Sequence, residues 1–137
     1  MRYKDKLEFE IDLDSDIKNK KIIKLVLQPL IENAIYHGLK YKESKGLLVV
    51  KGYSQGEDIL FEIKDNGVGM DSETMEHIFE RHKVNYRSNG VGVYNVQRRI
   101  KLSYGQEYGI TYQSTPGEGT VATVRIPKDR RDFHEKE

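Results

Sequence analysis

The connections between strand-like segments restrict the fold of this chain more than any other feature of its sequence. Residues Leu7–Leu13 alternate apolar and acidic side chains with a period of two, which predicts a half-buried strand with one face on a core. The next segment, Lys21–Gly38, repeats apolar residues at spacings of three and four and so predicts an amphipathic helix. Pro29 removes one backbone donor inside this helix, which should kink it or divide it into two pieces, and we expect a kink.

The remaining strand-like segments form two pairs, each joined by a turn. We therefore predict two β-hairpins, the first of which has a longer turn at Ser54–Asp58. The four strands of these hairpins are Leu47–Tyr53, Ile59–Lys64, Tyr108–Ser114 and Thr120–Ile126. Because a hairpin joins antiparallel strands, a purely parallel sheet is excluded. The sequence thus predicts an α/β fold, a two-layer sandwich whose mixed sheet is covered on one face by helices.

Three further segments complete the prediction. Gly90–Tyr104 has apolar residues along one face and predicts a second helix. Residues 71–89 are polar and irregular, which is typical of a mobile loop, with a short helix near Thr74–Phe79. Residues 128–137 are nearly all charged, and we expect a frayed tail there. The sequence therefore predicts one domain, residues 1–127, followed by this tail.

Composition excludes several classes of function. Lys and Arg total 23 against 22 for Asp and Glu, so the net charge of +1 provides no general attraction to nucleic acid or to anionic membranes. The absence of cysteine excludes disulfides, thiolate zinc sites and a cysteine nucleophile, and it is typical of a reducing compartment such as the cytoplasm. The sequence contains no run of about 18 apolar residues, so we expect no membrane contact by this segment.

The first candidate functional residue is Asn33, on the first predicted helix. At 100° per residue it lies at the centre of a polar face together with Pro29, Tyr36 and His37. An amide oxygen can complete the octahedral shell of a magnesium ion that takes its other ligands from phosphates and water. Taken alone, however, the pattern favours an exposed or capping asparagine.

The second candidate is Asp65, in the run Asp65-Asn66-Gly67-Val68-Gly69 that directly follows a predicted strand. A carboxylate at the end of a strand can accept a hydrogen bond from the exocyclic amine of adenine, which guanine does not offer at that place. Such a site would select ATP over GTP. Glycines permit positive φ and let the backbone approach the flat face of a base. The same residues also make a common turn, so this run alone leaves both interpretations open.

The third candidate is Gly90-Val91-Gly92, at the start of the second predicted helix. Free backbone donors and the positive end of the helix dipole make a phosphate site there, and Arg87 could add positive charge. A flexible junction is the alternative. Neither glycine pair extends to G-x-G-x-x-G, because Ser72 and Asn95 occupy the third glycine position, and no P-loop sequence is present. Rossmann and P-loop nucleotide sites are therefore excluded.

Together and in this order, the motifs resemble those of the GHKL ATPase superfamily, in the form found in LytS/YesM-type bacterial sensor histidine kinases. Gln28–Gly38 resembles the N box, Asp65–Met70 the first glycine box and Asn89–Ile100 the second. Gly117–Thr120 is similar to the last turn of the family. The resemblance covers about residues 3–127 and implies a Bergerat ATP-binding fold. It also places an ATP lid at residues 71–89, between the two glycine boxes.

The resemblance further implies roles for single residues in binding ATP and magnesium. Asn33 is implied as the magnesium ligand and Asp65 as the acceptor of the adenine amine. Glu32 and His37 flank the metal and phosphates, and Asn33, Glu32 and Arg87 are the candidate catalytic residues. The other nucleotide-binding residues that it implies are Gly67, Gly69, Met70, Gly90, Val91, Gly92 and Thr120.

One departure from the superfamily pattern bears on the reaction. Members that hydrolyse ATP with water carry a glutamate four residues before the magnesium asparagine, whereas this chain has Pro29 there. The resemblance therefore implies weak hydrolysis and transfer of the terminal phosphoryl group to a histidine, which needs no water-activating base. We expect that histidine on an upstream dimerisation domain of the same parent protein. The expected setting is the cytoplasmic part of a sensor kinase, with a response regulator as an indirect partner.

Three alternatives to a histidine kinase remain open from the sequence. An anti-sigma-factor-like serine kinase has a similar fold and similar boxes, although Gln28-Pro29 and Tyr94-Asn95 argue against it. A degenerate nucleotide sensor would bind ATP without transferring phosphate. A protein-interaction module would bind no nucleotide at all.

Overall fold

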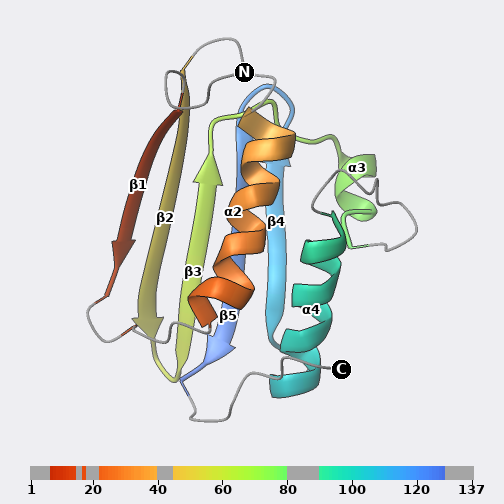
Figure 1. The fold of residues 1–137 in the computed structure, drawn as a ribbon. Coiled ribbons are helices and arrows are strands. Elements are labelled where there is room, and N and C mark those ends of the chain that lie inside the picture. Colours follow the sequence, from red (N-terminus) through yellow and green to blue (C-terminus); the bar gives the residue numbers. More distant parts are fainter. Residues whose placement is uncertain (1–6, 15–16, 18–21, 40–44, 80–89, 129–137) are drawn as a thin grey trace.

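The computed structural model describes residues 7–14, 17, 22–39, 45–79 and 90–128 of the chain (Figure 1). For His37, Gly38, Gly90 and Val91 it describes the backbone only. The helices lie in one layer over a single sheet, as Figure 1 shows. Arg87, most of the predicted lid (residues 80–89) and the predicted tail from residue 129 onward lie outside the described residues.

The sheet has five strands in the order β1-β2-β3-β5-β4. Their bounds are Leu7–Leu13 for β1, Gly46–Gln55 for β2, Asp58–Asp65 for β3, Gly109–Thr115 for β4 and Gly119–Pro127 for β5. β1 runs parallel to β2, and all other neighbours are antiparallel. The prediction of a mixed sheet with two hairpins is therefore confirmed.

The first hairpin has a tighter turn than predicted. β2 and β3 remain paired to Gln55 and Asp58, which leaves only Gly56 and Glu57 in the turn. Gly56 has a φ of +62° at the first turn position, where two-residue hairpin turns often carry glycine. The prediction of a longer turn was wrong because Ser54 and Gln55, although polar, continue the strand β2.

The predicted first helix is one continuous helix whose winding changes along its length. It consists of η2 (Ile23–Leu27), α2 (Gln28–Asn33) and η3 (Ala34–Leu39), in which the η segments are wound more widely than an α-helix. The N–H of Gln28 donates to the carbonyl of Ile23, five residues back. Pro29 has no N–H, and it directly follows the wider winding of η2, so the winding changes where the helix lacks a backbone donor. The helix therefore passes Pro29 without dividing into two pieces (Figure 1).

Two further helices follow the hairpin of β2 and β3. α3 spans Ser72–Glu76, somewhat earlier than predicted, because the Asp71 side chain caps it by accepting a hydrogen bond of 2.8 Å from the N–H of Thr74. α4 spans Gly90–Tyr104, as predicted. In the described part of the chain no helix is both long and apolar enough to cross a membrane.

The core lies between the helices and the inner face of the sheet. Helical residues such as Val26, Leu30 and Ile100 are less than 3% exposed there, as are Phe61 and Ile63 of β3. Burying a side chain of this size stabilises the fold by about 1.5–3 kcal/mol. This packing places α2 over the end of β3 and the start of β5, where the polar motifs lie.

The prediction that one face of Leu7–Leu13 covers the core is wrong for the middle of that strand. Leu7 and Leu13 pack at the margin of the core, but Phe9 and Ile11 are 45% and 59% exposed. The reason is position, since β1 is one of the two edge strands and the described helices pack on the four other strands. Period two shows that a strand has an apolar face, but it cannot show what covers that face.

Candidate functional site

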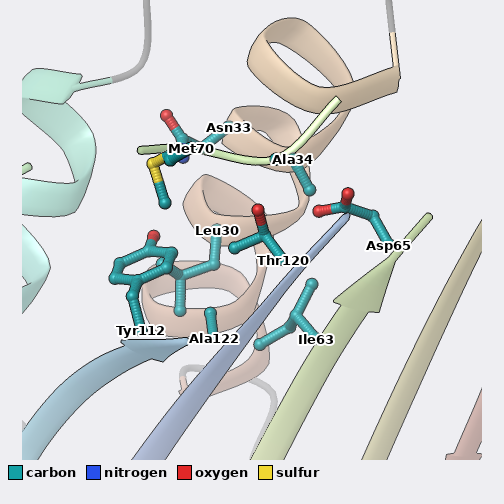
Figure 2. Close-up of a pocket in the computed structure, with 10 residues that line it drawn as sticks. Leu30, Asn33, Ala34, Ile63, Asp65, Met70, Tyr112, Thr120 and Ala122 are labelled. Carbon is teal, nitrogen blue, oxygen red and sulfur yellow. The ribbon is translucent and has the colours of Figure 1, made fainter. Parts of the chain in front are cut away.

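A pocket lies between α2 and the inner face of the sheet (Figure 2). It brings together five residues predicted from the sequence: Asn33, Asp65, Gly69, Met70 and Thr120. Its other lining residues are Leu30, Ala34, Ile63, Tyr112 and Ala122. Figure 2 shows Asp65 on one side and Asn33, Met70 and Tyr112 on the other, with Thr120 between them. The walls between the polar groups are apolar, which suits a flat organic ring.

Asp65 ends β3 and is only 5% exposed. Its Oδ1 accepts a hydrogen bond of 2.8 Å from the N–H of Gly67, so the run after β3 is a turn closed by the aspartate side chain. Burial raises the pKa of Asp65 from 3.8 to about 6, against the opposing effect of backbone donors at Gly67 and Thr120. The turn interpretation and the functional interpretation are thus compatible, because one carboxylate both closes the turn and faces the pocket.

The raised pKa of Asp65 predicts that ligand affinity and stability respond to pH in opposite directions. Below pH 6 the folded protein binds a proton at Asp65 that the unfolded chain binds only near pH 4, so this group favours folding at low pH and the contribution is lost as pH rises through 6. A ligand amine, in contrast, needs the ionised carboxylate. We expect adenosine affinity to rise between pH 5 and pH 7 while the stability contribution falls, as measured by calorimetric titration and urea unfolding. Asp65→Asn should remove both changes, and a pH response that survives in this variant would contradict the assignment.

Asn33, the last residue of α2, is buried at 6% exposure. The interpretation that the helical pattern favours when taken alone, an exposed or capping asparagine, is therefore wrong, because the helix turns this residue toward Tyr112 of β4 and the pocket. Its Oδ1 has no hydrogen-bond partner among the described residues. A buried, unpaired amide oxygen is costly unless a ligand completes it, and it is a hard donor of the kind that magnesium prefers. Asn33 thus fits the magnesium ion that the resemblance implies.

Ser114 of β4 connects two parts of the site that no sequence motif links, the loop after β3 and the start of β5. Its Oγ accepts a hydrogen bond of 2.8 Å from the N–H of Met70 and donates one of 2.8 Å to the carbonyl of Gly119. It also lies 2.8 Å from Oγ1 of Thr120. Ser114 therefore joins the first glycine box to the start of β5, a role that becomes visible only when the two strands are aligned.

Gly69 and Gly119 allow this close approach. A Cβ on Gly69 would lie 2.1 Å from the carbonyl oxygen of Thr115, and a Cβ on Gly119 would lie 2.1 Å from that of Asp65. Both residues also have positive φ, +76° and +111°. The loop is further held by a hydrogen bond of 2.7 Å from the N–H of Gly117 to the carbonyl of Val68. In this structure both glycines serve backbone packing around the pocket.

Asn66 fixes the other side of the same loop. Its Oδ1 accepts a hydrogen bond of 2.7 Å from the N–H of Leu47, and its own N–H donates to the carbonyl of Leu47 at 3.2 Å. The loop after β3 is thereby tied to β2 as well as to the turn between β4 and β5. The tendency of asparagine in a turn to bond backbone groups is the sequence property that could have indicated this role.

The other predicted site residues lie away from the pocket or outside the described residues. Glu32 is exposed, and its carboxylate accepts a hydrogen bond of 3.3 Å from Gln28 on the same helix. Gly92 faces α2, since a Cβ there would contact Cβ of Pro29 at 3.4 Å. The backbones of Gly90 and Val91 form the first turn of α4, whereas the His37 side chain and all of Arg87 lie outside the described residues.

The pocket is narrow in this conformation. Its cavity volume is about 30 Å³, space for a water molecule but too little for an adenine ring. A ligand of nucleotide size therefore requires movement of the lining, and the Met70 side chain and the loop after β3 form part of that lining. Chemically, the site offers an acceptor for a ring amine at Asp65 and a hard oxygen for a cation at Asn33.

The sequence between residues 18 and 130 matches the family described as histidine kinase-, DNA gyrase B-, and HSP90-like ATPases. The chain belongs to this family. Its curated relatives include the sensor histidine kinase YesM of Bacillus subtilis, 32% identical over 126 residues, and the sensor histidine kinase YpdA of Escherichia coli, 34% identical over 129 residues. These matches cover 92% and 94% of this chain but only 20% and 22% of the relatives, so the chain spans about a fifth of their length. The resemblance to LytS/YesM-type kinases is confirmed.

Solved structures show the same fold for this member of the ATPase family. The nucleotide-free catalytic domain of histidine kinase ThkA matches with a TM-score of 0.71 at 20% identity, covering 91% of this chain and 81% of that one. The histidine kinase domain of the blue-light activated kinase from Erythrobacter litoralis matches with a TM-score of 0.66 at 17% identity, covering 89% and 52%. The predicted α/β sandwich is therefore confirmed as the fold of histidine kinase catalytic domains.

Proposed function

We propose that this domain binds ATP with magnesium and transfers the terminal phosphoryl group to a histidine on another domain of its parent protein. The observation that carries this proposal is the placement of Asp65 and Asn33, two buried polar groups that face one pocket from opposite sides. The names of two curated relatives, the sensor histidine kinases YesM and YpdA, support the same reaction class.

Asp65 is proposed to select adenine. Its buried carboxylate accepts the exocyclic amine, while Ile63, Ala122 and Leu30 provide the apolar walls for the ring. Thr120 lies beside Asp65 at the start of β5, because these two residues are paired across the sheet. Gly67 keeps the carboxylate oriented through its N–H, so the acceptor is in place before the ligand arrives.

Asn33 is proposed to hold magnesium through Oδ1. The bound ion would neutralise charge on the phosphates, which is the main requirement of phosphoryl transfer. The backbone at the start of α4, Gly90 to Gly92, is proposed to meet the phosphates, with Arg87, Glu32 and His37 as additional candidates nearby. Pro29 occupies the position of the hydrolytic glutamate, so water is not activated there and a histidine serves as acceptor.

Phosphoryl transfer is tested with labelled ATP, magnesium, this chain and the separately produced histidine-bearing domain of the parent protein. We expect acid-labile, alkali-stable phosphate on that domain and little free phosphate without it. Asn33→Ala should lower the transfer rate by about 10-fold, because one neutral ligand is lost while phosphates and water retain the ion. Gln113→Ala, an exposed amide on β4, is the matched control and should leave the rate unchanged.

The form of the product separates the alternatives. Acid-stable phosphate on a partner serine would indicate the serine kinase, and ATP binding without any transfer would indicate a nucleotide sensor. If ATP with magnesium neither binds nor raises the thermal stability of the chain, the proposed function is wrong and an interaction module is favoured.

A further inference from the structure

Tyr112 of β4 is a polar residue of the pocket to which the proposed reaction assigns no role. Its side chain extends from the sheet into the pocket, and its hydroxyl points toward the side on which Asn33 and Met70 lie (Figure 2). The hydroxyl oxygen is buried, and it has no hydrogen-bond partner within the described part of the chain. Buried polar groups are nearly always paired, so an unpaired one in a pocket indicates a missing ligand atom.

The ring of Tyr112 is held in place by its surroundings. It packs on Phe79, just after α3, with ring centroids 5.8 Å apart and planes inclined by 51°. Leu30 and Asn33 of α2 line the same part of the pocket. The hydroxyl is therefore presented to the pocket by a ring with little freedom to turn away.

The hydroxyl is a hydrogen-bond donor at neutral pH. A phenol keeps its proton at neutral pH, so its O–H is available to an acceptor. The Asn33 side chain lies beside the hydroxyl, but by distance and angle neither the hydroxyl nor Asn33 Oδ1 has a hydrogen-bond partner among the described residues. This side of the pocket thus offers one O–H donor and one hard acceptor to a single ligand.

A metal-bound phosphate is the ligand chemistry that satisfies both atoms. The cation takes the amide oxygen, and a phosphate oxygen accepts the phenol O–H. Adenine suits the Tyr112 hydroxyl and Asn33 Oδ1 less well, because Asp65, the proposed partner of adenine, lies on the opposite side of the pocket. We propose that Tyr112 is a positioning residue that donates its hydroxyl hydrogen to an oxygen of the ATP phosphate chain, beside the magnesium held by Asn33. This inference rests on the proposed function.

The test is Tyr112→Phe, which removes the hydroxyl and keeps the ring and its contact with Phe79. We expect the dissociation constant for ATP with magnesium, measured by calorimetric titration, to rise by about 5- to 10-fold. The dissociation constant for adenosine should stay unchanged, because adenosine has no phosphate. The melting temperature without ligand should stay equal or rise, since the variant removes a buried polar atom that lacks a partner.

Tyr108→Phe is the matched control, because the Tyr108 hydroxyl bonds Asp58 at 3.1 Å at the far end of the sheet. It should leave both dissociation constants unchanged. Equal ATP affinity of Tyr112→Phe and wild type would overturn the inference about Tyr112 alone, and so would an equal loss for ATP and adenosine or a lower melting temperature. Absence of ATP binding by the wild type would overturn the proposed function as well.

Discussion

Asp65→Asn is expected to weaken ATP binding by about 100-fold, because a charge-assisted hydrogen bond contributes about 1.5–3 kcal/mol and the new amide places a donor against the adenine amine. The change is nearly isosteric, so the shape of the pocket is kept. Calorimetric titration with ATP and magnesium measures the loss. The variant should be folded and at least as stable as wild type at pH 8, since burial disfavours the ionised carboxylate in the folded protein.

Asp58→Asn provides the control for this experiment. Asp58 begins the same strand at its other end, where it is also buried and bonds Arg125 at 2.6 Å. Its replacement can lower stability by loosening that pair, but ATP affinity should remain that of wild type. Unaltered ATP affinity in Asp65→Asn would show that adenine is not recognised at the end of β3.

Gly119→Ala is expected to destabilise the fold by about 3 kcal/mol or more, because it combines backbone strain at positive φ with a steric clash. The new Cβ would lie 2.1 Å from the carbonyl oxygen of Asp65, a contact that only movement of the strands can relieve. The backbone of Asp65 must move to relieve this contact, and Asp65 is the proposed acceptor of the adenine amine. We therefore expect ATP affinity to fall as well. Urea unfolding measures the free energy of unfolding, and calorimetric titration measures the affinity.

Gly117→Ala separates strain from steric clash. Gly117 lies two residues earlier and has a similar positive φ of +83°, but a Cβ there would meet nothing within 4 Å. Gly117→Ala should therefore lower the free energy of unfolding only through backbone strain, by about 1–2 kcal/mol, and should keep wild-type affinity for ATP. Equal losses in Gly117→Ala and Gly119→Ala would show that the close approach of β5 to Asp65 is unimportant for stability.

Local patterns in the sequence predicted most of the fold. The helix Gly90–Tyr104 was predicted with its observed bounds, and the strand Leu7–Leu13 likewise. Both depend on hydrophobic period, and the helix also on glycine at its ends, which are properties of neighbouring residues. The prediction failed where a distant segment decides the outcome, as at Phe9 and Ile11, which are apolar but exposed on an edge strand.

The candidate site was predicted in part. Asp65 and Asn33 were named from the sequence, and the structure places both in one pocket. Taken alone, however, the helical pattern favoured an exposed or capping Asn33, because a helical wheel shows which residues share a side but not what packs against it. Tyr112 and Ser114 were not predicted as site residues, since an isolated tyrosine or serine on a strand has no distinctive local pattern.

The sequence by itself determined the kinds of element, their order and the polar groups that a nucleotide could use, because periodicity, turn chemistry and motif spacing are encoded by residues close together in the chain. Tertiary structure alone decided which of those groups are buried, which face one another and which lack a partner. Asn33 and Tyr112 are 79 positions apart in the chain and meet only because α2 packs over β4. Their unsatisfied atoms arise from that packing, and the proposed phosphate contact of Tyr112 follows from it.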